Sequence, residues 1–171
     1  AVFDMIVGSC RWELSGETPP LDLIRRRSTC LVANYPNRGT HTMGAAVDIS
    51  VFNLDNREEI SRGKSYLEMS EYTPMNSPFI SPEEQQNRRE ITAAMERHGF
   101  LHYPGEFWHY NKGDALYHYM AKTGKAADYG PVHWDPATNQ VTPYNDVNSP
   151  LTPPAEMAAH LDAAIARLDA Q

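Results

Sequence analysis

Hydrophobic and polar residues alternate most clearly between residues 43 and 52. Val47, Ile49 and Val51 are separated by small or polar residues, a spacing of two that is typical of a half-buried strand rich in β-branched residues. Successive side chains of a strand point to opposite faces, so Asp48 lies on the face away from the valines. We therefore expect a strand that carries a carboxylate on its second face.

The strongest helical pattern begins at Ser81. Ser81 is a predicted N-cap, Pro82 takes the first helical position, Glu84 completes a capping box and Gly99 marks the end. These signals predict a helix from Pro82 to about residue 98. The residues expected on its shared face are Ile91, Ala94, Met95 and His98.

Both ends of the chain carry further helical patterns. The apolar residues 2–7 predict a helix that stops at Gly8, and residues 21–27 predict a second, short helix. Near the other end, apolar residues recur at helical spacing and predict a final helix. They are Met157, Leu161, Ile165 and Leu168.

The remaining segments predict loops and a hairpin. Residues 53–78 are polar and interrupted by Gly and Pro, and we expect this segment to form a lid or wall that covers a functional site. Residues 100–103 and 107–110 are expected to form two strands joined by a turn at Pro104–Gly105. Residues 125–154 are rich in Pro, Asn and Asp and are expected to be extended.

The length of 171 residues favours one domain with an appended segment. We expect a catalytic domain at residues 1–124 and a C-terminal extended arm and helix at residues 125–171. The arm is expected to pack either on the core or on a neighbouring subunit. In the second case the protein would be a homo-oligomer.

Charge and hydropathy narrow the range of partners. The net charge is −7 and the longest basic run is Arg25–Arg27, which argues against a nucleic-acid partner. A membrane is not expected to be a partner either, since no apolar run approaches the roughly 20 residues of a spanning helix. Two cysteines favour free thiols over a disulfide and hence the cytoplasm; the periplasm remains the alternative if a leader was removed upstream.

Two segments carry candidate chemistry. In the first, His41 precedes the predicted strand that bears Asp48, with only small residues near them; the second contains Glu106 and His109. Two histidines, one aspartate and a spare glutamate provide the three ligands and the base that a catalytic zinc site needs. A histidine near a strand is more often a structural, hydrogen-bonded residue, so both interpretations stand on the residues alone.

Spacing adds one condition to the zinc interpretation. Glu106 and His109 are three residues apart, so they would face opposite sides of a regular strand. A bulge or loop at Gly105–Glu106 is therefore expected.

The two segments resemble known sequence motifs. His41, Gly44, Ala46 and Asp48 fit H-x-x-G-x-A-x-D, and residues 106–109 fit E-x-W-H. Both motifs, in this order, are similar to those of the D-alanyl-D-alanine dipeptidase family, the VanX-like zinc metallopeptidases. The resemblance extends over roughly residues 1–119.

This resemblance implies an α+β fold with a small antiparallel β-sheet, flanking helices and a single zinc site. It also implies one Zn²⁺ per chain, held by His41, Asp48 and His109, with Glu106 as general base and acid. The implied reaction is hydrolysis of D-alanyl-D-alanine or a related short dipeptide, a hydrolase activity directed at cell-wall peptidoglycan building blocks. The implied partner is a small peptide substrate.

One catalytic residue of the family has no counterpart in its usual place. Relatives carry an arginine that is implied to stabilise the oxyanion beside the zinc, and its position would fall a few residues before Ala1. We therefore expect the chain to lack an N-terminal part, or another arginine to take this role. Arg11 and Arg38 are the candidates, and Arg38 is nearer to the first histidine in sequence.

The substrate pocket also departs from the family pattern. Gly39 stands where many relatives have serine, and the acid of a Gly-x-x-Phe-Asp stretch is missing near residues 63–67. Glu68 is a candidate replacement or a surface charge. Trp108 fits equally as part of the core and as a substrate-binding wall.

These departures leave two alternatives to a dipeptidase. One is a D,D-carboxypeptidase or endopeptidase that acts on longer cell-wall peptides with the same zinc site. The other is a non-catalytic, zinc-containing module that binds peptides. The presence of Glu106 argues against the second, because a binding module does not need a base beside its metal.

Overall fold

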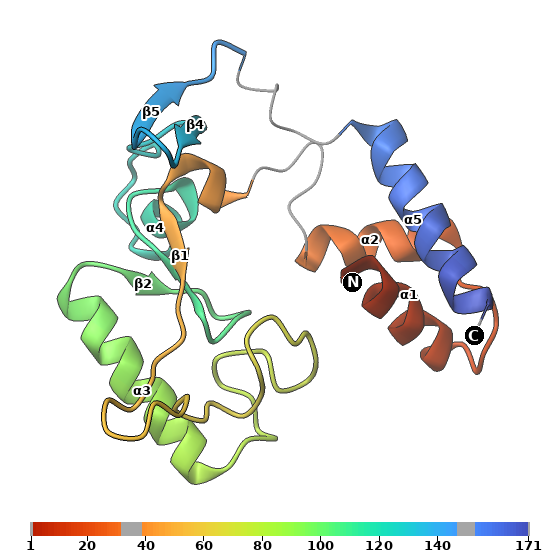
Figure 1. The fold of residues 1–171 in the computed structure, drawn as a ribbon, viewed down its shortest axis with the longest axis horizontal. Coiled ribbons are helices and arrows are strands. Elements are labelled where there is room, and N and C mark those ends of the chain that lie inside the picture. Colours follow the sequence, from red (N-terminus) through yellow and green to blue (C-terminus); the bar gives the residue numbers. More distant parts are fainter. Residues whose placement is uncertain (1, 32–38, 147–152, 171) are drawn as a thin grey trace. The chain divides into compact units, whose positions relative to one another are not determined.

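The computed structural model describes residues 2–31, 39–146 and 153–170. Within it the chain forms two compact units: residues 1–39 with 144–171, and residues 40–143. Figure 1 shows the helices and strands of each unit. The extended arm and helix expected at residues 125–171 is thus divided between the two units.

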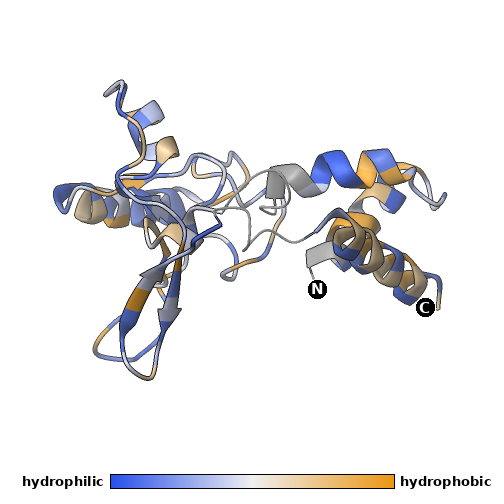
Figure 2. Ribbon diagram, turned by 90° about the horizontal axis from the view of Figure 1, so that it is seen from above, coloured by the Kyte–Doolittle hydropathy of each residue, from blue (hydrophilic) through white to orange (hydrophobic). Residues whose placement is uncertain are grey.

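The first unit consists of three helices, α1 (Val2–Glu13), α2 (Leu21–Leu31) and α5 (Pro154–Asp169). Helix α1 packs against both α2 and α5, and hydrophobic and hydrophilic residues alternate along these helices (Figure 2). The core they enclose contains Ile6, Val7, Cys10, Ile24, Leu161 and Ala164. The predicted face of the final helix is confirmed by Leu161, Ile165 and Leu168, which pack in this core.

Helix α1 continues through Gly8 to Glu13, so the predicted stop at Gly8 is wrong. The apolar face extends past Gly8 to Cys10, which is completely buried. Burial of this face outweighs the roughly 1 kcal/mol by which glycine disfavours a helix. Helix α2 likewise runs beyond the predicted end at residue 27, to Leu31.

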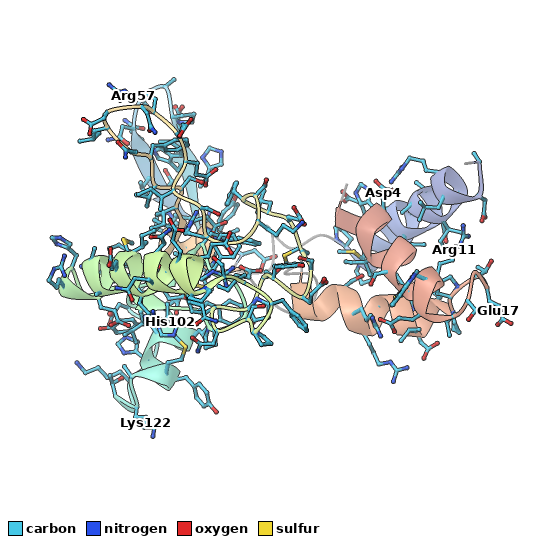
Figure 3. The ribbon with its side chains drawn as sticks, turned by 90° about the horizontal axis from the view of Figure 1, so that it is seen from below. Asp4, Arg11, Glu17, Arg57, His102 and Lys122 are labelled. Atoms are coloured by element: carbon cyan, nitrogen blue, oxygen red, sulfur yellow. The ribbon has the colours of Figure 1, made fainter. Side chains whose placement is uncertain are left out.

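Ion pairs join the two ends of the chain within this unit. Arg167 donates to Asp4 at 2.6 Å, and Arg11 pairs with Asp169. Figure 3 labels Asp4 and Arg11 on α1. The first and last helices are therefore linked by charges as well as by their apolar core.

The second unit is built on a three-stranded antiparallel sheet. Strand β3 (His109–Asn111) lies between β1 (Ala46–Asp48) and β2 (Leu101–His102). Helices η1 (Thr40–Met43), α3 (Pro82–Arg97) and α4 (Ala115–Met120) accompany it, and β4 (Val132–Asp135) pairs with β5 (Gln140–Pro143). The predicted α+β class and the hairpin between β2 and β3 are confirmed.

Strand β1 is shorter than its hydrophobic alternation predicts. Ala46 is buried and Val47 is 38% exposed, so the side chain of Ala46 faces the core within this strand. Only three residues pair with β3, and the chain leaves the sheet after Asp48. Ile49 and Val51 then pack on the core from irregular structure.

Helix α3 begins as its sequence predicts. Ser81 accepts from the Glu84 amide while the Glu84 side chain accepts from the Ser81 amide, which completes the capping box. Gly99 follows the helix with φ +81°, the left-handed conformation that glycine adopts at low cost. His98 is exposed, so it does not share the buried face with Ile91.

A buried arginine of α3 holds the predicted lid segment in place. The Arg88 side chain donates to the backbone carbonyls of Arg62, Tyr72, Pro74 and Met75. Its guanidinium also lies over the Phe107 ring, 4.3 Å from the centroid. Residues 49–80, which contain little regular structure, are thereby fixed against the core formed by Met75, Ile91, Phe107, Trp108 and Tyr110.

The segment predicted to be wholly extended contains a hairpin instead. Strands β4 and β5 lie within residues 125–154, and the turn between them is closed by Asp135, which accepts from the Ala137 amide and the Thr138 hydroxyl. Asn139 takes a left-handed conformation with φ 55°. This Asx-type turn explains why the Asn- and Asp-rich stretch reverses direction.

Candidate metal centre

Three side chains of the second unit converge at one point. His41 comes from η1, Asp48 ends β1 and His109 begins β3. Asp48 and His109 are direct cross-strand partners, so their side chains lie next to each other on one face of the sheet. Ligand atoms from all three residues lie within 4.8 Å of one another.

The distances within this cluster fit a single metal ion. His109 Nδ1 is 3.0 Å from Asp48 Oδ1, His41 Nε2 is 3.1 Å from His109 Nδ1, and His41 Nε2 is 3.3 Å from Asp48 Oδ1. Zinc–ligand distances of about 2.0–2.1 Å in tetrahedral geometry place neighbouring ligand atoms roughly 3.3 Å apart. The three groups are thus spaced nearly as ligands of one ion would be.

The ionisation of Asp48 also suits a cation. Burial acts to raise the pKa of Asp48, but hydrogen bonds with His109 and His41 outweigh it and hold the pKa below its usual range. The hydrogen bond to Asp48 raises the pKa of His41, against the opposing effect of burial. Asp48 is therefore an anion in the form that a divalent metal binds.

Glu106 lies beside the cluster from the loop before β3. Its Oε2 is 3.7 Å from His109 Nδ1, and its side chain is 18% exposed. The amide of Glu106 donates to the carbonyl of Tyr103, and the amide of His109 donates to the carbonyl of Glu106. This turn confirms the expected irregularity, because it brings Glu106 and His109 to the same side.

Burial raises the pKa of Glu106, although the nearby charge of His109 acts to lower it. A hydrogen bond with the Trp108 side chain also lowers this pKa. Trp108 itself is 1% exposed and packs against Phe107 in the core. Of the two roles considered for Trp108, the structure places it in the core, with an added contact to Glu106.

Behind His109 runs a chain of polar groups that the sequence did not reveal. Thr40 Oγ1 is 3.4 Å from His109 Nε2 and accepts from Asn111 Nδ2 at 3.3 Å. Asn111 also donates to Asp114, a completely buried residue that caps α4 by accepting from the Tyr117 amide. The far nitrogen of His109 is thus linked to the start of α4.

Tyr66 is a second contact that motif spacing missed. Its hydroxyl donates to Asp48 Oδ2 at 3.2 Å, and its ring stacks edge-on against Trp108 at 5.8 Å. Burial raises the pKa of Tyr66, with a further contribution from the charge of Asp48, so the hydroxyl keeps its proton for this hydrogen bond. Tyr66 comes from the lid segment, which makes that segment a wall of the site.

Of the other predicted pocket residues, Glu68 lies in the same unit as the cluster but in a different cavity. Glu68 pairs with Lys64 at 3.4 Å and lines a separate cavity with Glu59 and Arg62. Arg38 lies outside the described residues. Arg11 belongs to the three-helix unit, where it pairs with Asp169.

Comparison with known proteins identifies the family. Residues 26–124 match the profile of the D-ala-D-ala dipeptidases. The chain belongs to this family. The matched region includes all four residues of the candidate centre and ends before the β4–β5 hairpin.

Curated relatives carry the same description. The D-alanyl-D-alanine dipeptidase of Enterococcus faecium is 35% identical over 81 residues, which cover 47% of this chain and 40% of that protein. The D-alanyl-D-alanine dipeptidase of Synechocystis is 34% identical over 88 residues, 45% of this chain and 35% of that protein. The match therefore spans less than half the length of each of these two relatives.

None of the helices in the described parts of the chain is long and apolar enough to cross a membrane.

Proposed function

We propose that this chain is a zinc-dependent peptidase that hydrolyses D-alanyl-D-alanine or a related short dipeptide. His41, Asp48 and His109 would hold one Zn²⁺ per chain. The observation that carries the proposal is the convergence of these three ligand atoms within 4.8 Å, with Glu106 Oε2 3.7 Å from His109. Two imidazoles and one carboxylate, with a fourth position open to water, form a donor set typical of catalytic zinc.

Each residue of the centre has a distinct role in this proposal. Zinc at this position would supply a Lewis acid that polarises the peptide carbonyl and acidifies a water molecule. Glu106 takes the proton of the attacking water and passes it to the departing amine. Burial raises the pKa of Glu106, which helps this carboxylate to hold the proton between the two transfers.

Neighbouring residues keep the groups oriented. Tyr66 donates to the Asp48 oxygen Oδ2, which leaves Oδ1 toward the two histidines. Trp108 contacts Glu106 through its side chain. The rings of Tyr66 and Trp108 stack on each other, so the lid segment that carries Tyr66 and the base Glu106 are supported by one aromatic pair.

The test combines metal content with product release. Purified protein reconstituted with zinc is expected to hold about one metal per chain by mass spectrometry and to release D-alanine from D-alanyl-D-alanine. Glu106→Gln should keep the metal and lose turnover by about 100- to 10,000-fold, the usual contribution of a general base. Glu96→Gln is the matched control, because Glu96 pairs with His102 on the exposed side of α3.

Three results would contradict the proposal in different ways. Absence of metal after reconstitution removes the proposed centre. Full activity in Glu106→Gln removes the proposed base. Metal binding without hydrolysis of any peptide supports the alternative of a non-catalytic binding module.

A further inference from the structure

A cavity next to the candidate metal centre is lined in part by residues beyond the matched family region. Helix η1 and the β4–β5 hairpin enclose a cavity of about 570 Å³, and Figure 1 shows this hairpin next to η1. The cavity includes His41, a residue of the candidate metal centre. Its apolar wall consists of Met43, Tyr129, Val132, Trp134 and Val141.

One face of the hairpin supplies most of this wall. Trp134 and Val141 are cross-strand partners, and Val132 lies two residues from Trp134, so all three side chains share a face. Trp134 is 56% exposed and Val141 is 59% exposed. Two large apolar side chains are therefore left uncovered beside a proposed catalytic metal.

The wall is fixed to the sheet that carries the metal ligands. The amide of Asp128 donates to the carbonyl of Gly113 at 2.7 Å, and its carboxylate is 3.2 Å from His118 Nε2. A Cβ at Gly113 would lie 2.7 Å from the Tyr129 ring, so the two segments are in close contact there. Gly113 follows β3 by two residues, which ties the wall to the strand of His109.

The Trp134 ring is also held in position. Its Nε1 donates to Asn139 Oδ1 across the hairpin turn at 3.0 Å. A ring that is already ordered loses little conformational entropy when a ligand covers it. The apolar wall is thus preorganised to bind a ligand.

We propose that this cavity binds a bulky apolar side chain of the peptide whose scissile bond lies at the metal centre. The inference rests on the proposed function and specifies its substrate class: short peptides with an aromatic or large aliphatic residue next to the scissile bond. A cavity of about 570 Å³ lies within the 300–1,000 Å³ typical of small-ligand sites. The two methyl side chains of D-alanyl-D-alanine would leave its aromatic wall uncovered.

The position of His41 indicates that the group bound in the cavity is a side chain of the substrate. Because His41 belongs to both the metal cluster and the cavity, a peptide held at the metal has a side chain within reach of the wall. Among the described residues that line the cavity, the acidic one is Asp128, which is paired with His118. The wall therefore favours an apolar group over a cationic one.

Binding can be measured separately from hydrolysis. Zinc-loaded Glu106→Gln is titrated with D-Ala-D-Phe, D-Phe-D-Ala and D-Ala-D-Ala, and tryptophan fluorescence is followed, with Trp134→Phe used to assign the signal. At least one phenylalanine dipeptide is expected to bind about tenfold more tightly than D-Ala-D-Ala. Trp134→Ala and Val141→Thr, each combined with Glu106→Gln, should remove this preference.

Hydrolysis by the active protein provides the second readout. The ratio of kcat/KM for the preferred phenylalanine dipeptide to that for D-Ala-D-Ala should fall about 10- to 100-fold in Trp134→Ala, the range expected for losing a large apolar contact. Leu54→Ala is the control, since Leu54 is 79% exposed in the same unit and does not line this cavity. Thermal unfolding of Val141→Thr, which keeps a β-branched side chain in β5, shows whether the hairpin remains folded.

Several outcomes separate this inference from the proposed function. Equal affinity for all three dipeptides, or a preference that survives in Trp134→Ala, overturns the apolar site even when D-Ala-D-Ala is hydrolysed. Selective binding that depends on Trp134, in a protein that hydrolyses none of the dipeptides, supports the site and overturns the proposed reaction. Loss of a dimer in Trp134→Ala with an unchanged preference would show that a second copy of the chain covers the wall, which also overturns the inference.

Discussion

His109 is contacted from both sides of its ring. Nδ1 faces Asp48 and His41, whereas Nε2 faces Thr40. If Nδ1 binds the metal, Nε2 carries the proton and donates to Thr40 Oγ1, which fixes the tautomer. Partners of this kind orient metal ligands and commonly contribute 10- to 100-fold to metal affinity.

We therefore expect Thr40→Val to weaken zinc binding by about 10- to 100-fold, because valine keeps the shape of threonine and removes its oxygen. Competition with a chromophoric chelator measures the affinity. Thr40→Ser retains the hydroxyl and should restore most of the loss. Wild-type affinity in Thr40→Val would show that the contact does not orient His109.

Trp108 leads to a different expectation, because it contacts the base and not the metal. Trp108→Phe keeps a buried aromatic ring and removes the hydrogen bond to Glu106. A hydrogen bond to a charged group contributes about 1.5–3 kcal/mol, so we expect kcat to fall about tenfold or more while the metal content stays the same. Steady-state kinetics with metal analysis tests this; Trp12→Phe, at a position 83% exposed, is the control. A rise in KM alone would contradict a role through Glu106.

The residues brought together at the centre differ in how visible they are in the sequence. His41, Asp48, Glu106 and His109 were found because each pair lies within one short segment of recognisable spacing. Thr40 was missed because its importance depends on a contact with a strand far along the chain. Tyr66 was missed for the same reason: its segment has no periodicity, and only Arg88 and the core determine where it lies.

At the scale of elements, α3 shows how local signals and long-range contacts differ. Its start could be predicted because the capping box needs only four consecutive residues. Arg88 could not be predicted to be buried, since its partners are carbonyls of irregular structure. Burial lowers the pKa of Arg88 to about 10, with a further effect from the charge of Arg62.

Loss of Arg88 should release the lid segment, residues 53–78, from the core. Arg88→Met leaves several carbonyls of that segment without their donor, and each buried unsatisfied group costs about 1–3 kcal/mol. We expect the free energy of unfolding to fall by about 3 kcal/mol or more in urea titrations. Arg89→Met is the matched control, because Arg89 bonds to Gln86 on the exposed side of the same helix. Equal effects of the two substitutions would count against this role of Arg88.

The capping box should make the stability of α3 depend on pH. The hydrogen bond from the Ser81 backbone lowers the pKa of Glu84, aided by the Ser61 hydroxyl. A carboxyl whose pKa is lowered by folding stabilises the protein above its unfolded pKa, near 4.5, and this stabilisation is lost as the pH falls through the folded pKa. Chemical unfolding from pH 6 to pH 3 should therefore show a smaller pH dependence in Glu84→Gln than in the wild type. Glu83→Gln, in the same helical turn, should behave like the wild type.

The other elements were predicted less well where their stability depends on distant partners. The stop at Gly8 failed because α5, at the far end of the chain, covers the apolar face of α1. The length of β1 failed because pairing with β3, and not alternation, sets where a strand ends. Local patterns show which residues are apolar, but not which segment will cover them.

At the scale of the whole molecule, the chain divides into units that the sequence did not suggest. The boundary expected at residue 124 reflected a change in composition, whereas the compact units divide at Gly39 and Pro143. The first unit joins the two ends of the chain through α1 and α5, a long-range pairing that periodicity cannot reveal. Self-association through the C-terminal segment stays a prediction, which light scattering can test.

All four residues of the proposed centre belong to the second unit. If the units are energetically independent, damage to the first should leave the metal centre intact. Leu161→Ala tests this, because Leu161 is completely buried among α1, α2 and α5. Removing such a side chain typically costs about 2–5 kcal/mol.

Calorimetry of zinc-loaded Leu161→Ala should show a lowered transition for the three-helix unit and an unchanged one for the unit of residues 40–143. Zinc affinity and D-alanine release, measured below both transitions, should match the wild type. Leu21→Ala, at a position 38% exposed in the same helical unit, should shift neither transition by much. A parallel loss of zinc affinity and helical stability in Leu161→Ala would instead show that the helices support the catalytic centre, and the two units would then have to be treated as one cooperative structure.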